Sequence, residues 1–436
     1  MGQHFGGPHR PRVWLVLASV LVAAGLVGLR SSPAQAGSTV VVSTPGQLVT
    51  AVTGANPGDT IQLQPGNYPI STTLDVGVAN LTVDHRGRPA CHYCDQCRRG
   101  CHTASYFNSP SVTLPAAART GKFTLVSDAI VSDLLVDASG RATGVHYIDR
   151  NSREHREASA RVVVVAAGAL ESTRILLNSK SSAHSHGVGN SNGMLGHYLM
   201  DHFTVEGANG LMAELTSSKR QPVGRPCGFL IPKYVNTSIS SAKDRNSKFL
   251  RGYRFDGDGS QELYGHAFLL PQFGDAWRRR VREEIPYGFG IEAQGECLPR
   301  FENFVQLSPQ KKDAWGIPVL HINASYGENE KSMAIAMRQD ISAILDAMHL
   351  ADGTPPKDEI SMFGKNIHEC GTARMGSDPK KSVVDANCKV HDAPNVFVTD
   401  GAVFPTQGCY EPTLTIMAIS ARAGEHIAKA FRQGQL

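Results

Sequence analysis

The sequence has little net charge of either sign. Its 43 lysines and arginines nearly balance 39 aspartates and glutamates, which leaves a net charge of +4 over 436 residues. It also lacks a dense basic run with interleaved aromatic side chains, the pattern typical of nucleic-acid binding. We therefore expect no nucleic-acid role. The 41% hydrophobic and 19% charged content argues against a disordered chain and predicts a folded protein of two or three domains.

The N-terminal segment lacks an arginine pair ahead of its apolar run, so the twin-arginine export route is not supported. Arg10 and Arg12 precede the run Val13–Leu29, and the small-x-small pattern AQA follows at residues 34–36. This order is typical of a secretory signal peptide. The alternative is a membrane anchor, for which the run is at the short limit. We expect a signal peptide at residues 1–36 and an exported protein, either periplasmic or secreted.

The next segment, residues 37–87, lacks the length of a complete solenoid. Turn sequences PGD (57–59) and PGN (65–67) separate short alternating runs, TIQL (60–63) and NLTV (80–83). The pattern resembles the first coils of a secreted parallel β-helix of the pectin lyase kind. Each coil buries its apolar face against the next, so such a stack usually needs three or more repeats. Here the pattern stops after one or two, and it holds no catalytic constellation of a lyase.

A cysteine cluster follows this segment. Its spacing is C-x2-C-x2-C-x3-C, formed by Cys91, Cys94, Cys97 and Cys101. The spacing matches the bacterial ferredoxin run that binds an iron–sulfur cluster, although His102 stands where that run has proline. Four thiolates can also hold zinc, and an exported chain can pair cysteines as disulfides. Spacing alone leaves these three readings open.

Residues 123–179 predict an α/β arrangement. The apolar run Phe123–Asp137 and the run Ala142–Asp149 flank a turn and predict a hairpin. The run Arg161–Gly168 is a β-branched strand typical of a buried sheet, and Ala169–Ser179 continues with helical spacing. A strand, a glycine turn and a helix form half of a nucleotide-binding unit. An ordinary βα unit would have the same sequence pattern.

The C-terminal region supplies a second strand and a long helix. Asn395–Thr399 predicts a strand that ends at Asp400-Gly401, and Thr413–Phe431 predicts a helix with Pro412 in its first turn. His368 lies in a predicted loop, where a lone histidine is more often structural or solvated than catalytic.

Six stretches carry a family resemblance: GRPACHYCDQCRRGC, AAGALESTRILLNS, GNSNGMLGHYLMDH, KKDAWGIPVLHI, HECGTARMGSDP and VTDGAVFPTQGCYEPTLTIMAISAR. From about Arg88 to its end, the chain resembles the glucose–methanol–choline (GMC) family of FAD-dependent oxidoreductases. The cysteine run is most similar to the bacterial membrane-associated sugar and gluconate dehydrogenase branch. Some relatives there carry an iron–sulfur cluster near this place, so the resemblance also implies a cluster on the four cysteines.

The resemblance implies two catalytic residues. His368 matches the histidine that removes the hydroxyl proton of an alcohol while hydride passes to the flavin, and a neutral imidazole suits this role. Glu411 stands where the family has histidine or asparagine. A carboxylate can accept a hydrogen bond or proton, but it adds negative charge beside a flavin that becomes anionic on reduction. Glu411 is therefore catalytic, neutral or a mark of altered chemistry.

The resemblance also implies contacts to FAD. They are Asp400 and Gly401 at the flavin, Thr413 at the helix start that faces the flavin ring, Val131 at the adenine, and Ala167 and Gly168 at the strand end near the dinucleotide. Amide dipoles at the start of such a helix can stabilise negative charge that develops on the flavin.

The strand–GxGxxG–helix unit that holds the FAD pyrophosphate in this family is not found in the sequence. Residues 288–293 (GFGIEA) fit GxGxxA by letter, but Gly295 and Pro299 follow them instead of a helical pattern. Residues 187–189 (GVG) also fail, with Asn192 at the third glycine position. We expect this chain to bind FAD poorly or not at all, and to expose apolar surface.

The predicted fold is α/β (α+β), with the β-helix-like start ahead of an incomplete GMC fold. Its parts are a portion of the FAD-binding domain at 88–202, a substrate domain with a mixed or antiparallel sheet at 203–360, and a segment at 361–436 that returns to the FAD domain. The predicted function is FAD-dependent oxidation of the CH–OH group of an alcohol or sugar, with an electron-acceptor subunit as the expected partner. The alternatives are a non-catalytic fusion joined at about residues 86–88 and a secreted β-helix protein that binds or acts on carbohydrate.

Overall fold

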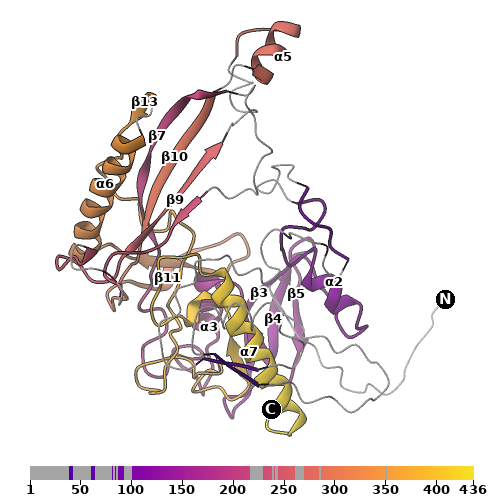
Figure 1. The fold of residues 1–436 in the computed structure, drawn as a ribbon. Helices are drawn as coiled ribbons and strands as arrows, with labels where there is room; N and C mark the ends of the chain where they lie inside the picture. Colours follow the sequence, from indigo (N-terminus) through magenta and orange to yellow (C-terminus); the bar gives the residue numbers. More distant parts are fainter. Residues whose placement is uncertain are drawn as a thin grey trace.

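The computed structural model describes residues 39–42, 60–63, 81, 84, 87–92, 101–216, 229–237, 240, 244–260, 270–283, 286–348 and 351–436. Figure 1 shows two bodies of packed elements: a broad sheet backed by one long helix, and a second body of shorter strands and helices. The C-terminal part of the chain returns to the second body and pairs there with an earlier strand.

A parallel pair of short strands lies at the centre of the second body. β6 (Val163–Val165) pairs with β14 (Val396–Val398), and most of their valines are buried, as in strands covered on both faces. α3 (Ala169–Asn178) follows β6 through Gly168, whose φ of 89° belongs to the left-handed region that favours glycine. The predicted strand–glycine–helix unit is therefore confirmed, and its partner strand comes from the C-terminal region.

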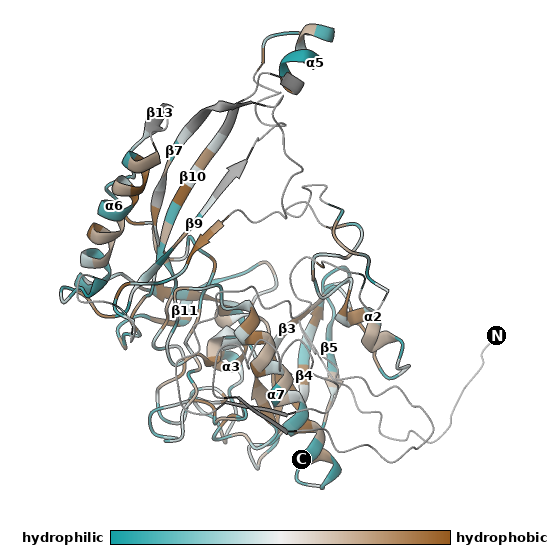
Figure 2. Cartoon of the chain, viewed as in Figure 1, coloured by the Kyte–Doolittle hydropathy of each residue, from teal (hydrophilic) through white to brown (hydrophobic). Residues whose placement is uncertain are grey.

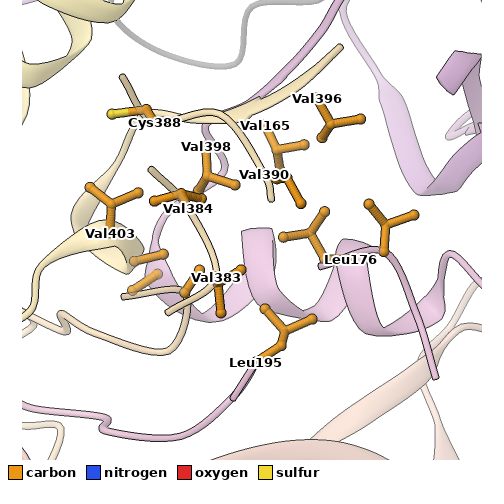
Figure 3. Packing of buried hydrophobic residues seen from close by; sticks show 14 of the residues in the cluster. Val165, Leu176, Leu195, Val383, Val384, Cys388, Val390, Val396, Val398 and Val403 are labelled. Carbon is orange, nitrogen blue, oxygen red and sulfur yellow. The ribbon is translucent and has the colours of Figure 1, made fainter. Parts of the chain in front are cut away.

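One hydrophobic cluster joins these elements. The buried positions of α3 recur at helical spacing, and Figure 3 shows Leu176 of this helix gathered with Val165, Val390 and Val398. These side chains come from α3, β6 and the C-terminal region. Their shared burial fixes the C-terminal region against the earlier βα unit.

A three-stranded antiparallel sheet flanks this centre. Its strands are β3 (Ala129–Val136), β4 (Ala142–Asp149) and β5 (His155–Ser159), in that spatial order. The predicted hairpin is confirmed, but the strand predicted to begin at Phe123 begins only at Ala129. Asp128 has a φ of 54°, and this left-handed conformation interrupts the extended backbone.

The broad sheet is antiparallel at every described pairing. Its strands, in spatial order, are β13 (Ala351–Thr354), β7 (Phe203–Thr216), β10 (Pro286–Gly295), β9 (Tyr253–Ser260) and β8 (Phe229–Ile231). This agrees with the sheet predicted for residues 203–360. The GFGIEA stretch lies inside β10, which confirms that it is no dinucleotide fingerprint.

α6 (Glu328–Met348) covers one face of this sheet. Met333, Met337 and Ile341 recur at three- and four-residue spacing, are fully buried, and pack in a second hydrophobic cluster with Phe203. This packing holds the first residue of β7 and, through the strand pairing, the end of β10. α5 (Gly274–Glu283) lies apart from this packing, beyond the far end of the sheet, and is largely hydrophilic (Figures 1 and 2).

Five further elements belong to the second body and to its border with the sheet. They are α2 (Thr113–Ala118), the antiparallel pair β11 (Phe304–Lys312) and β12 (Pro318–Asn323), the 3₁₀ turn η4 (Gly401–Val403), and α7 (Thr413–Arg432). The predicted C-terminal helix is thus confirmed. Within the described part of the chain, no helix has both the length and the apolar character needed to cross a membrane.

Little of the N-terminal region is described. β1 (Thr39–Val42) pairs in parallel with β2 (Thr60–Leu63). The predicted signal peptide at residues 1–36, Cys94 and Cys97 lie outside the described residues. The β-helix-like start therefore stays a prediction.

Candidate functional site

The loop that carries His368 is held by one buried carboxylate. The backbone N–H of His368 donates to Oδ1 of Asp201 at 3.0 Å, and the N–H groups of Gly364 and Asn366 donate to its Oδ2 at 3.0 and 3.3 Å. Asp201 is fully buried, and this burial raises its pKa to about 6 although the three N–H groups oppose the shift. The position of the His368 backbone therefore depends on a residue just before β7.

Gly371 allows the same loop to pass close to the chain at Tyr198. Its φ is 90°, and a Cβ built on it would lie 2.0 Å from the carbonyl oxygen of Tyr198. The N–H of Gly371 donates to the carbonyl of Gly401 at 3.0 Å, which ties the loop to the turn after β14. Only glycine fits a backbone that is both left-handed and this close to another backbone.

Replacing Gly371 with alanine is expected to lower the free energy of unfolding by more than the roughly 1–3 kcal/mol of backbone strain, because the clash with Tyr198 adds to it. Gly364→Ala is the matched control. Gly364 has a φ of 87°, but a Cβ there would meet nothing within 4 Å. Chemical denaturation of both variants checks the prediction, and equal losses would show that the close approach at Tyr198 is unimportant.

A second histidine ring contacts His368. Nδ1 of His202 lies 3.0 Å from Nδ1 of His368, and the two rings meet edge to face. His202 is fully buried, its Nε2 hydrogen-bonds the carbonyl of Gly408, and its Nδ1 lies 3.0 Å from Nε2 of Gln294. Burial lowers the pKa of His202 to about 3, so this imidazole is neutral at working pH.

A buried arginine pairs with Glu411. Arg254 on β9 is 1% exposed, and its guanidinium contacts the carboxylates of Glu411 and Asp256. Its Nε donates to the carbonyl of Cys409 at 2.5 Å. Asp256 is half-buried, and this burial raises its pKa, while Arg254 opposes the shift. The charge that Glu411 adds to the site is therefore balanced by a guanidinium from the broad sheet.

These charges act on His368. Burial is the main cause that lowers the pKa of His368; the Glu411 carboxylate opposes this shift, and Arg254 reinforces it. His368 is half-buried, so its ring is partly removed from water but stays accessible to a small molecule. A neutral imidazole in this state can accept a proton near neutral pH.

The residues that the resemblance assigns to the flavin side of FAD gather beside this cluster. Ala167 and Gly168 are exposed where β6 ends, and a Cβ on Gly168 would meet nothing within 4 Å. A Cβ on Gly401 would lie 2.9 Å from the carbonyl of Glu369 and 3.7 Å from Ile416 of α7, so the turn after β14 packs against both the His368 loop and that helix. Thr413 is exposed at the start of α7, which has no side-chain cap.

Asp400 joins the ends of the two parallel strands. Its Oδ2 accepts the N–H of Gly168 at 3.1 Å and the hydroxyl of Ser172, while its Oδ1 accepts the N–H of Ala402 at 2.9 Å. Its carboxylate is therefore engaged with the protein itself.

Val131, predicted at the adenine, lies on β3 in the neighbouring sheet, where it packs against the same core.

The end of β6, the turn after β14 and the start of α7 form one edge of the second body. This edge fits a cofactor whose groups lie close to the protein backbone. Open space at Gly168 lets a planar or phosphate-bearing group reach the strand end, and the uncapped N–H groups of α7 favour negative charge beside His368. The edge lies at the carboxyl ends of parallel strands, where ligands of open α/β sheets bind. The residues present there fit the flavin end of FAD.

The cysteine cluster is only partly described. Cys101 accepts the N–H of Tyr106 at 3.4 Å and lies 3.4 Å from the hydroxyl of Thr103, and Cys91 is half-buried. Cys94 and Cys97 lie outside the described residues. In the described ranges no three histidine, cysteine or acidic side chains are placed to hold a metal ion. The iron–sulfur cluster stays a prediction.

Sequence reasoning missed His202, Gln294, Arg254 and Asp201. The stretch GNSNGMLGHYLMDH contained the pair Asp201-His202 directly before a strand, which was the available signal. Arg254 and Gln294 had no signal, because each is a single polar residue inside a strand pattern. Strand pairing brings them together at one end of the sheet.

Two family models match the chain. Both are described as GMC oxidoreductase; the N-terminal one matches residues 64–204 and the C-terminal one matches residues 299–420. The first match begins earlier than the resemblance recognised from about Arg88, and it overlaps the last part of the segment that we predicted to be β-helix-like.

Curated relatives match over most of this chain. The 2-methyl-1,2-propanediol dehydrogenase of Mycolicibacterium austroafricanum is 31% identical over 67% of this chain and 52% of its own length. The fructose dehydrogenase large subunit of Gluconobacter japonicus is 29% identical over 80% of this chain and 61% of its own length. The chain thus spans between half and two thirds of the length of these relatives.

Solved structures share the fold. The crystal structure of pyridoxine 4-oxidase from "Mesorbium loti" superposes with a TM-score of 0.52 at 18% identity, over 75% of this chain and 61% of that one. At this identity the likeness concerns the fold alone.

Proposed function

The chain belongs to the GMC oxidoreductase family, and from this premise we propose that its site oxidises the CH–OH group of an alcohol or sugar with FAD as the cofactor. The observation that carries the proposal is the half-buried His368. It is anchored by Asp201, contacts His202, and lies within the field of the Arg254–Glu411 pair. This cluster borders the edge that fits the flavin.

The proposed role of His368 is to take the proton of the substrate hydroxyl. Its Nδ1 faces His202, which leaves Nε2 as the ring atom for this task. The lowered pKa keeps the ring unprotonated and ready to accept a proton at neutral pH. When bound, FAD would accept the hydride that leaves the carbon bearing that hydroxyl, so that the C–O bond becomes a carbonyl. Glu411, held by Arg254, can accept a hydrogen bond from a substrate hydroxyl and orient it.

The substrate class is inferred from relatives and from the polar character of the site. The relatives named above are a diol dehydrogenase and a fructose dehydrogenase subunit. Glu411 is half-exposed and Asp256 is partly exposed, so two carboxylates can accept hydrogen bonds from a molecule with several hydroxyls. We propose a small polyhydroxylated alcohol or a sugar.

FAD would be held by Ala167 and Gly168 at the end of β6, by Asp400 and Gly401 after β14, and by Thr413 at the start of α7, with Val131 at the adenine. We propose that this binding is weak, because the sequence holds no strand–GxGxxG–helix unit for the pyrophosphate. Visible absorption of the purified chain tests this point. One oxidised flavin for every chain would contradict weak binding and leave the proposed oxidation intact.

Four further proposals rest on the sequence, on the relatives and on one strand pairing. An electron-acceptor partner subunit is supported by the relative named as a large subunit. Export is supported by the signal-peptide pattern within residues 1–36. An iron–sulfur cluster on the four cysteines is supported by their spacing and by the resemblance to the sugar and gluconate dehydrogenase branch. The β-helix-like start has its support in the turn pattern of residues 37–87 and in the parallel pairing of β1 with β2.

The test is an assay of the purified full chain with excess FAD and an artificial dye as electron acceptor. We expect dye reduction that depends on both FAD and a substrate hydroxyl, with fructose, gluconate and 2-methyl-1,2-propanediol as the first substrates. Absence of dye reduction with every alcohol and sugar, at FAD concentrations that saturate flavin binding, would instead favour the non-catalytic alternative.

A further inference from the structure

Both ring nitrogens of His202 have hydrogen-bond partners, and these bonds link the broad sheet to the C-terminal loops. It directly precedes β7, and Gln294 lies near the end of the neighbouring strand β10. Nε2 of His202 contacts the carbonyl of Gly408, while its Nδ1 lies 3.0 Å from Nε2 of Gln294 and 3.0 Å from Nδ1 of His368. The backbone carbonyls of Gly408 and Cys409 determine which of these nitrogens carry protons.

The first carbonyl fixes His202 itself. A carbonyl oxygen only accepts hydrogen bonds, so Nε2 of His202 carries a proton and donates it to Gly408. The ring is buried, and burial lowers its pKa to about 3, so it holds no second proton at neutral pH. Nδ1 of His202 is therefore an unprotonated acceptor.

The second carbonyl fixes Gln294. Nε2 of Gln294 lies 3.3 Å from the carbonyl of Cys409, and only the amide NH₂ group can donate to that oxygen. The second N–H of the same group points to Nδ1 of His202. If the amide oxygen and nitrogen of Gln294 were exchanged, its oxygen would face two atoms that only accept, the Cys409 carbonyl oxygen and Nδ1 of His202. Gln294 thus supports the same protonation state of His202.

The remaining contact then determines the tautomer of His368. Two unprotonated nitrogens cannot hydrogen-bond each other, so at this 3.0 Å contact Nδ1 of His368 carries the proton, and it shares the one lone pair of His202 Nδ1 with the N–H of Gln294. We infer that His202 is a positioning residue that holds His368 as the Nδ1–H tautomer, with the lone pair of Nε2 free to take the substrate proton. The catalytic value of this arrangement rests on the function proposed above.

Nothing else in the described part of the chain performs this task. The hydrogen bond to His202 is the only one that the described residues make to the His368 ring. The charges that act on the ring include the carboxylates of Glu411, Glu369 and Asp256. Without His202, an Nε2–H tautomer could donate to a carboxylate and would lose the lone pair that the reaction needs. Removing His202 should therefore change the tautomer as well as the packing.

The tautomer can be measured on the full chain without FAD. In ¹⁵N-histidine-labelled protein, long-range ¹H–¹⁵N NMR spectra distinguish a protonated ring nitrogen from an unprotonated one, and His368→Ala assigns the signals. At neutral pH we expect protonated Nδ1 and unprotonated Nε2 in wild-type His368. A wild-type ring protonated at Nε2 would overturn the inference without any variant.

Two substitutions of His202 separate positioning from packing. H202F keeps a ring of similar size but removes the acceptor, so we expect the Nδ1–H tautomer to be lost. H202N places an amide oxygen near the former Nδ1, so it should restore that tautomer. H391F is the matched control, because the His391 ring hydrogen-bonds the Ser382 hydroxyl outside this site. An unchanged tautomer in H202F would contradict the inference, as would equal loss in H202N.

Activity gives an independent readout. With FAD and dye, H202F should lower kcat roughly 10- to 100-fold with little change in KM, as when the outer partner of a functional imidazole is removed, and H202N should regain most of that rate. An active wild type with an Nε2–H ring would refute the positioning role and keep the proposed oxidation. An inactive wild type with the expected tautomer, lost in H202F, would refute the oxidation and keep the role of His202.

Discussion

Replacing His368 with alanine is expected to lower kcat/KM for FAD-dependent alcohol oxidation by about 10²- to 10⁴-fold, the usual contribution of a general base. The half-buried ring is held by Asp201 through its backbone and by His202 through its Nδ1. The alanine variant lacks the ring nitrogen that is proposed to take the substrate proton. Steady-state dye reduction across several substrate concentrations measures the loss, which should appear in kcat.

His391→Ala is the matched control for this experiment. His391 is also half-buried and its ring also makes a hydrogen bond, to Ser382, but it contacts no residue of the site described above. It should retain the wild-type rate. If the His368 variant oxidised alcohols at the wild-type rate while binding FAD normally, the assignment of the base would be wrong.

Replacing Arg254 with methionine is expected to shift the acid limb of the kcat/KM profile to higher pH. His368 must be unprotonated to act, so the rate falls as pH falls through the pKa of His368. Arg254 helps to lower this pKa, whereas Glu411, Glu369 and Asp256 raise it. Without the guanidinium, the carboxylates of Glu411 and Asp256 lack their counter-charge and the pKa of His368 rises. The variant should also lose roughly 1–3 kcal/mol of stability, because the Cys409 carbonyl and the carboxylates lose a donor.

Two controls separate the electrostatic effect from the loss of stability. Glu411→Gln removes a cause that raises the pKa of His368, so the acid limb should shift in the opposite direction, to lower pH. Arg300→Met breaks another pair, with the fully buried Glu330, and should lower stability without moving the limb. If both Arg254→Met and Glu411→Gln moved the limb in the same direction, the pairing would not set the pKa of His368.

The Arg254 pair also bears on the substitution of Glu411 for the family's histidine or asparagine. From sequence alone, the negative charge of this carboxylate was expected to oppose flavin reduction, so Glu411→Asn was expected to raise activity. In the structure the carboxylate contacts a buried guanidinium that balances its charge. Glu411→Asn would leave Arg254 paired with Asp256 alone, so its effect depends on the whole Arg254 group and not on Glu411 by itself.

Local pattern was sufficient for several elements. The valine run before Gly168 predicted β6, the spacing of Leu176 and its neighbours predicted α3, and Pro412 marked the start of α7. These predictions held because β-branched runs, helical periodicity and proline at a helix start act within a few residues. The strand predicted from Phe123 was too long, because a left-handed residue at Asp128 has no strong signal in the apolar pattern.

The sequence by itself determined the family, the βα unit at Gly168 and the C-terminal helix, and it predicted His368 as the base. Only the tertiary structure decided what surrounds that base: His202 and Gln294 at adjacent strands, Asp201 beneath the loop, and Arg254 against Glu411. The physical reason is the range of the forces involved. Propensity and periodicity act along the chain, whereas these contacts depend on strand register and on the packing of α6, which bring together side chains from distant parts of the chain.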